Sequence, residues 1–266
     1  MTDRDDATGK AGAVRAGGCA AWELGLDEVL VARTRRLVGS VATGLRLPDG
    51  LAGDLVLGAS ELAANVWLHG GGPVVVEDGR PVAGLPEVWV YARGTAPREL
   101  VVTVFDTGEW AETTTDVPAI GVPDPEAEHG RGLQIVAGLA AGAGGRWGRH
   151  LSRSRLGRCR VPGTASWLAL PLPAGVLMDP RGRPPSPADA IEQLAGHLTT
   201  RGAGAGLIRG SNRVEALLSC PAGLTVWARY GAYRWEDANG LRQCPYADVV
   251  DAAEHLLAVM APPPRR

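Results

Sequence analysis

The sequence predicts an α+β fold, in which a mixed β-sheet carries helices on one face and a small second unit follows. Apolar residues recur three or four positions apart across residues 30–45 and again across 49–69, which is the periodicity of amphipathic helices. Alternating or β-branched segments at Glu87–Ala92 and Glu99–Phe105 predict two adjacent antiparallel strands. A proline-rich stretch at 171–187 then marks a boundary before the tail.

Composition excludes several classes of protein. The chain has 266 residues, an apolar fraction of 45% and a net charge of −2, so we expect a real core and no bulk attraction to nucleic acid or a membrane. Its four cysteines form neither a CxxC pair nor a cluster with metal-ligand spacing. The first residues lack an apolar signal region, and no apolar run approaches membrane-spanning length. We therefore expect a cytoplasmic protein with free thiols.

The chain divides into four predicted segments. Residues 1–18 are polar and rich in glycine and alanine and are predicted to be disordered, and residues 19–172 form the first domain. Residues 173–187 form a linker. Residues 188–266 form a small αβββα domain, which resembles no family that we recognise; its predicted strands lie at 214–218, 224–230 and 233–235.

The segment Glu61-Leu-Ala-Ala-Asn65-Val-Trp-Leu-His69-Gly70 reads as the end of an amphipathic helix that Gly70 stops. Glu61 and Asn65 lie four positions apart, so their side chains leave the same face about one turn from each other. Such a pair can simply be a solvated one that supports the helix. It can also be the start of a site, and two motifs further along the chain favour the site.

Both of these motifs are short and contain glycine. Asp106-Thr-Gly108 follows a buried strand. Its carboxylate could accept a hydrogen bond from the exocyclic amine of a purine, while Gly108 lets the backbone approach the ring. The alternative is a turn that ends the strand. In His129-Gly130-Arg131-Gly132-Leu133, before a helix, backbone N–H groups could converge on phosphate oxygens with Arg131 adding charge. An ordinary glycine-rich helix entry is the alternative for the second motif.

The order of these motifs carries more information than any one of them. A helix with ExxxN, a strand ending in DxG, a long aperiodic loop and a GxGL helix start resemble the GHKL ATPase superfamily. Within it, the chain is most similar to the bacterial anti-sigma-factor serine/threonine kinases, which bind sigma factors and phosphorylate anti-anti-sigma proteins. The resemblance covers roughly residues 20–172 and implies the fold, a sandwich of the sheet with helices on one face.

The resemblance implies a role for each motif residue. Asn65 would hold Mg²⁺ that bridges the ATP phosphates, and Glu61 would be the general base for a substrate hydroxyl or for water. Asp106 would read adenine N6 with Gly108 beside the ring. Residues 109–128 would form the ATP lid, and its phosphate-side hinge would comprise Gly130, Arg131, Gly132 and Leu133. The implied cofactors are ATP and Mg²⁺, and the implied partner is a sigma factor or an anti-anti-sigma-like protein; the related kinases are commonly homodimers.

The chain departs from the family pattern at one position, because Trp110 stands where the family often has a second glycine. A tryptophan there bears on adenine packing or lid mobility, and a non-catalytic ATP-sensing module that binds a protein partner is the alternative function.

The arginine-rich stretch 149–160 has two interpretations. It is a solvated hairpin, or it meets an acidic partner or places an arginine near the phosphates. Direct nucleic-acid binding is not expected, because no aromatic residues interleave with these arginines.

Overall fold

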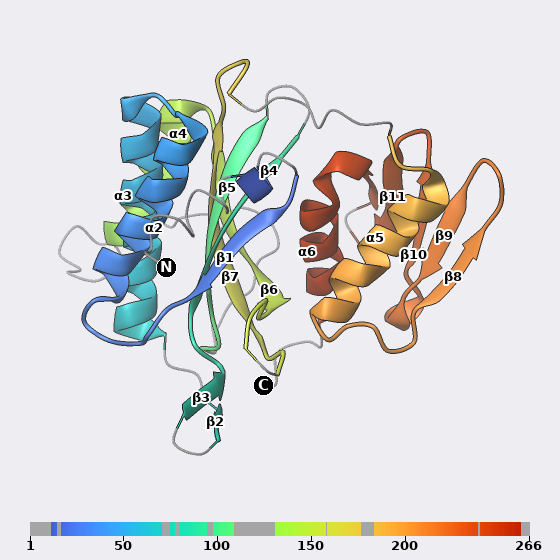
Figure 1. Ribbon diagram of the computed structural model, residues 1–266, viewed down its shortest axis with the longest axis horizontal. Helices are drawn as coiled ribbons and strands as arrows, with labels where there is room; N and C mark the ends of the chain where they lie inside the picture. Colours follow the sequence, from blue (N-terminus) through green and yellow to red (C-terminus); the bar gives the residue numbers. More distant parts are fainter. Residues whose placement is uncertain are drawn as a thin grey trace.

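The computed structural model describes residues 12–14, 17–70, 75–77, 80–94, 98–108, 131–157, 159–176, 184–238 and 240–261. These residues form two α+β units that lie side by side (Figure 1). The α+β class predicted from the sequence is confirmed. Trp110, the predicted lid at 109–128 and Gly130 lie outside the described residues.

The first unit is built on a five-stranded sheet of strand order β1-β4-β5-β7-β6. Every pairing in this sheet is antiparallel, where a mixed sheet was predicted. The reason is that β4 and β5 form one hairpin, β6 and β7 form another, and β7 inserts between β5 and β6. The strands are β1 Cys19–Glu23, β4 Glu87–Arg93, β5 Glu99–Asp106, β6 Arg146–Arg153 and β7 Pro162–Pro171. A separate two-stranded ribbon joins β2 Val75–Glu77 to β3 Arg80–Ala83.

Three helices cover one face of this sheet: α2 Leu30–Leu45, α3 Asp49–His69 and α4 Arg131–Ala143 (Figure 1). The 21-residue α3 is long and apolar enough to pass a composition test for a membrane span, although no membrane-length run was expected from the sequence. In the structure one side of the helix packs into the core, with Leu55, Ala59 and Leu62 almost fully buried, whereas Leu57, Trp67 and Leu68 are exposed. Gly58 sets the depth of this packing, because a Cβ there would lie 2.3 Å from Leu168 Cδ2.

The N-terminal prediction needs a correction. Residues 12–14, which were predicted to be disordered, are helical, and Val14 is buried in the same apolar cluster as residues of the helical layer. A single branched apolar residue in a polar, glycine-rich stretch produces no periodic signal, so its burial could not be read from the sequence. Residues 1–11 lie outside the described part of the chain.

The second unit is a five-stranded antiparallel meander flanked by two helices, and so it is αβββββα and not αβββα. The two additional strands, β8 and β12, are the edges of the sheet, and their mostly exposed residues give little apolar alternation. The predicted cap of α5 is present, since the Ser186 hydroxyl accepts a hydrogen bond from the Asp189 amide at 3.2 Å. The elements are α5 Pro187–Thr200, β8 Ile208–Ser211, β9 Ala216–Ser219, η1 Pro221–Gly223, β10 Thr225–Arg229, β11 Ala232–Asp237, β12 Gly240–Pro245, η2 Tyr246–Asp248 and α6 Val249–Met260.

The second unit packs against the face of the first sheet that α2, α3 and α4 leave uncovered. Tyr91, Val101 and Ala169 of the first sheet belong to the same buried apolar cluster as residues of α5 and α6. The two predicted domains therefore share a core along this contact, which we call the seam. The boundaries assigned to them from the sequence stay a prediction.

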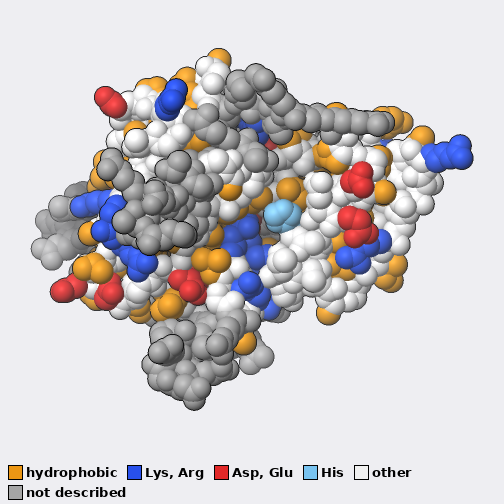
Figure 2. All heavy atoms as spheres, viewed as in Figure 1, with side chains coloured by type: hydrophobic (Ala, Val, Ile, Leu, Met, Phe, Trp, Pro, Cys, Tyr) orange, Lys and Arg blue, Asp and Glu red, His pale blue; other side chains and the backbone are white. Residues whose placement is uncertain are grey.

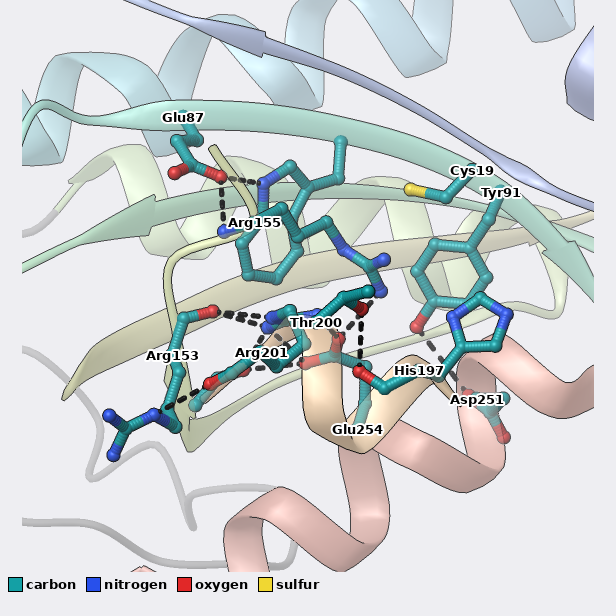
Figure 3. Close-up of polar contacts among 12 residues, drawn as sticks. Cys19, Glu87, Tyr91, Arg153, Arg155, His197, Thr200, Arg201, Asp251 and Glu254 are labelled. Carbon is teal, nitrogen blue, oxygen red and sulfur yellow. Dashed lines mark hydrogen bonds and ion pairs between the residues drawn. The ribbon is translucent and has the colours of Figure 1, made fainter. Parts of the chain in front are cut away.

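A buried carboxylate lies at the centre of the seam (Figure 3). Glu254 of α6, 2% exposed, accepts from Arg201 Nη1 at 2.5 Å, Arg155 Nη2 at 2.7 Å and Ser152 Oγ at 2.6 Å. His150 Nε2 lies 3.3 Å from the same carboxylate. Burial by itself would raise the pKa of Glu254, but the charges of Arg201 and Arg155 hold it well below its ordinary value.

The arginine-rich stretch forms much of this contact, so the solvated hairpin is wrong for these arginines. Arg153 Nε donates to the carbonyl of Arg201 at 2.8 Å, and Arg160 Nε donates to the carbonyl of Thr200 at 2.8 Å. These carbonyls end α5, where cations are favourable. Arg155 of this stretch pairs with an acidic side chain of the same chain, Glu254, at 2.7 Å.

Replacing the central carboxylate should loosen the seam. Glu254→Gln leaves Arg201 and Arg155 without their counter-charge, and we expect the free energy of unfolding at pH 7 to fall by about 3–5 kcal/mol. Because the folded-state pKa of Glu254 is depressed, its contribution is fully present above the unfolded pKa and is lost as pH falls through the folded value.

Denaturant titrations at several acidic pH values test this expectation, with the exposed Glu236→Gln as the control variant. The wild type should lose stability toward acid more steeply than Glu254→Gln. Equal stability of the two proteins at pH 7 would contradict the assigned role.

Candidate functional site

The candidate site begins on the outer part of α3, where Glu61 and Asn65 are both half-buried. Gly132, in the first turn of α4, lies against this pair. A Cβ built on Gly132 would lie 2.9 Å from Glu61 Oε2 and 3.7 Å from each of the two polar atoms of the Asn65 amide. Two motifs that are about 70 residues apart in the sequence, the ExxxN helix and the GxGL helix start, therefore meet at one place.

The side chain of Asn65 has a polar atom for which the described part of the fold supplies no hydrogen bond. Its amide nitrogen is buried and has no hydrogen-bond partner among the residues that the structure describes. A buried amide without a partner carries an energetic cost, which a bound ligand can remove. Its oxygen is a hard ligand of the kind that Mg²⁺ prefers, so the donor chemistry fits that cation.

Asp106 ends β5 and is 1% exposed. Its Oδ1 accepts a hydrogen bond from the Gly108 amide at 2.7 Å, which is the local turn that the DxG pattern predicts. The backbone here is closely packed, since a Cβ on Gly163 of β7 would lie 2.2 Å from the Asp106 carbonyl oxygen. Asp106 and Gly108 therefore lie at the closely packed end of the central strand β5.

A further charged residue, Arg149 of β6, has no role predicted from the sequence beyond its place in the arginine-rich stretch. Strand pairing aligns Leu151 with Thr164 and Thr164 with Asp106, so Arg149 and Asp106 lie on the same face of the sheet. Burial lowers the pKa of Arg149, and the Asp106 carboxylate opposes that shift. This is the face that α3 covers, so the structure places one arginine near the candidate site.

The structure thus brings Glu61, Asn65 and Gly132 together and places Asp106 at the end of the sheet that α3 covers. Arg131 begins α4, and Leu133 is half-buried against the core of the helical layer. Gly130 and the predicted lid lie outside the described residues. The roles assigned to these positions from the sequence stay predictions.

Comparison with known proteins assigns this part of the chain. Residues 26–143 match the family model described as the histidine kinase-like ATPase domain. That stretch, which holds Glu61, Asn65, Asp106 and Gly132, is similar to the GHKL-type ATPases, and domains of that family bind ATP, usually with Mg²⁺. The match supports an ATP-binding, kinase-like function for this part of the chain.

Beyond the family model, no curated protein matches the chain. Among solved structures, the chain is similar to the histidine kinase domain of the Erythrobacter litoralis EL346 blue-light activated histidine kinase, with 21% sequence identity. The match covers 65% of this chain and 76% of that chain at a TM-score of 0.26, and the family assignment does not depend on it.

The contact between α3 and α4 can be tested with glycine variants. Gly132→Ala places a methyl group against the Glu61 carboxylate, so Glu61 must move. We expect ATP affinity or turnover to fall about tenfold or more, because a shift of about 1 Å in a catalytic group can cost 10²-fold.

Gly138→Ala in the same helix is the matched control, since a Cβ there meets nothing within 4 Å. Alanine favours helix by about 1 kcal/mol over glycine, so this control should be at least as stable as the wild type. Nucleotide titration and thermal unfolding of both variants measure the two effects. Equal ATP affinity and turnover in the two variants would argue against the site.

Proposed function

We propose that this chain uses ATP and Mg²⁺ to phosphorylate a serine or threonine of a partner protein of the anti-anti-sigma kind, and that it also binds a sigma factor. The observation that supports this proposal is the meeting of Glu61, Asn65 and Gly132 within a domain whose family binds ATP. A carboxylate that can take a hydroxyl proton lies one helical turn from an amide that can hold a cation. The proposal includes a cytoplasmic setting and a homodimer.

Each residue has a defined part in this proposal. The Asn65 oxygen would hold Mg²⁺, which neutralises phosphate charge when bound. Glu61 would accept the proton of the attacking hydroxyl, and Gly132 leaves space for its carboxylate. Asp106 would accept a hydrogen bond from the adenine amino group, beside the small Gly108. The start of α4 would present backbone N–H groups to phosphate oxygens.

A second candidate, a non-catalytic ATP sensor, is favoured by one specific observation. Phe105, which immediately precedes Asp106, stacks on Trp89 with ring centroids 5.3 Å apart. The guanidinium of Arg201, from the second unit, lies 4.7 Å from the centre of the Trp89 ring, and Arg201 binds Glu254. Nucleotide at Asp106 could therefore act on the seam through two packed rings, and so alter what the second unit presents to a partner.

Calorimetric titration of ATP with Mg²⁺ tests the cofactor assignment. We expect the wild type to bind in the micromolar range and Asn65→Ala to lose most of that affinity, because the substitution removes the oxygen that would hold the cation. Asn212→Ala, a turn asparagine of the second unit, is the control and should bind like the wild type. Wild-type affinity in Asn65→Ala would show that Asn65 does not hold the metal.

Phosphate transfer from labelled ATP to a candidate anti-anti-sigma protein tests the chemistry. Glu61→Ala should keep ATP binding and lose transfer by about 10²–10⁴-fold, which is the usual contribution of a general base. Glu236→Ala controls for the loss of a carboxylate elsewhere. Transfer at the wild-type rate in Glu61→Ala would exclude Glu61 as the base. Intact ATP with every partner, together with partner affinity that changes with nucleotide, would select the sensor.

A further inference from the structure

A cleft of about 430 Å³ opens between the two units, on the face of the first sheet opposite to α3. Its volume falls within the range of about 300–1,000 Å³ typical of small-molecule sites, which often form where two domains meet. Aromatic side chains line it from both units, with Tyr91 and Trp167 on one side and Trp235 on the other. On the face drawn in Figure 2, arginine side chains and a histidine side chain gather between the two units.

The wall of the cleft that belongs to the first sheet is basic. Its basic side chains on the face toward the second unit are Arg93, Arg146 and His150. One carboxylate holds both guanidinium groups, because Glu99 accepts from Arg93 Nε at 2.9 Å and from Arg146 Nη2 at 2.8 Å. Arg93 Nη1 also pairs with Asp251 across the seam at 3.0 Å, whereas the side chain of Arg146 remains 63% exposed.

The wall that belongs to the second unit is acidic. It carries four carboxylates, one arginine and one histidine, namely Asp237, Asp248, Asp251, Glu254, Arg242 and His255. Three of these acids already have a cationic partner: Arg242 for Asp237, Arg93 for Asp251 and the buried arginines for Glu254. Asp248 differs, because its Oδ2 accepts a hydrogen bond from a neutral donor, the Gly94 amide, at 2.8 Å, while the charges of Arg98 and Arg93 act on it without a direct ion pair among the described residues.

Two buried polar atoms in the lining have no hydrogen-bond partner within the described chain. They are Asp248 Oδ1 and Trp235 Nε1, and both residues are only 3% exposed. One is an acceptor when ionised and the other is a donor. A buried polar atom without a partner costs about 1–3 kcal/mol, so both atoms favour an occupant that supplies a cation or donor to one and an anion or acceptor to the other.

We propose that the cleft binds a small zwitterion of the α-amino acid class, with its carboxylate toward the basic sheet wall and Trp235 and its ammonium group toward Asp248. Opposed charged walls favour a molecule with both charges over a simple anion or cation, because either simple ion would face one wall of its own sign. The aromatic residues suit an apolar or planar side chain. The site is separate from the nucleotide site and does not depend on the proposed kinase activity.

The test titrates the full chain with each of the twenty common amino acids and measures the thermal unfolding midpoint and the heat of binding. At least one amino acid should raise the midpoint, whereas its N-acetylated form and its carboxamide form should not. Absence of binding by every amino acid overturns the proposal. Equal binding of the N-acetylated form also overturns it, since a simple anion site would then remain.

Variants locate the binding. Trp235→Phe keeps the ring and removes the N–H, and it should weaken the bound amino acid about tenfold, the value of one hydrogen bond to a charged group. Asp248→Asn should weaken it about 100-fold; if that variant fails to fold, Trp235→Phe still decides the matter. Trp227→Phe is the matched control, because Trp227 lies on the opposite, solvent-facing side of the same small sheet.

Wild-type affinity in Trp235→Phe, or equal weakening in Trp227→Phe, would show that the amino acid does not bind in the cleft. Asn65→Ala separates the two proposals, since it should abolish ATP binding and leave amino acid binding unchanged. Loss of both by Asn65→Ala would contradict a separate site.

Discussion

The buried carboxylate of Glu254 is the constraint on which the arrangement of the two units depends. A charge at this depth is tolerated only with partners, and here two guanidinium groups, a hydroxyl and an imidazole surround it. Arg155 comes from the β6–β7 connection, whereas Arg201 comes directly after α5 and Glu254 belongs to α6. The second unit therefore supplies the Arg201–Glu254 pair, and the first unit completes it with Arg155 and Ser152.

This contact gives the first sheet two different faces. On one face, Val88, Val90 and Val102 pack beneath α2, α3 and α4, and that layer positions Glu61 and Asn65. On the other face, Trp89 lies beneath the guanidinium groups of Arg155 and Arg201, at 4.9 Å and 4.7 Å from the ring centre. Strand alternation places these neighbours on opposite sides. The five-stranded sheet thus separates the candidate functional site from the seam that holds the cleft.

Much of the first unit's fold and part of its site could be predicted from the sequence, because the fold's signals are local. Helical periodicity located α2 and α3, and β-branched alternation located β4 and β5. The meeting of Glu61 with Gly132 could be expected only through the resemblance to a family, since nothing local links positions 61 and 132. The antiparallel order of the sheet could not be predicted, because β7 inserts between β5 and β6 through tertiary packing, which leaves no periodic pattern in the sequence.

The seam could not be predicted for a related physical reason. In the sequence, arginines in a hairpin are interpreted as solvated because their partners are distant in the chain. Glu254, the partner of Arg155, lies about 100 residues further along. The edge strands β8 and β12 give little sequence signal because they bury few residues. The sequence pattern therefore indicates a separate tail domain without a site, whereas the acidic α6 completes both the charge network and the cleft.

The same reasoning explains why the cleft exists beside such a tightly bonded seam. Where opposite charges meet directly, as Arg93 and Asp251 do at 3.0 Å, the two units close on each other. Asp248 instead accepts from a backbone amide across the seam, and the indole nitrogen of Trp235 has no acceptor among the described residues. Burying these two groups without a direct ion pair among the described residues costs free energy, so the walls gain little by closing there. The docking of the units by charge therefore leaves a cavity at the place where charge pairing is incomplete.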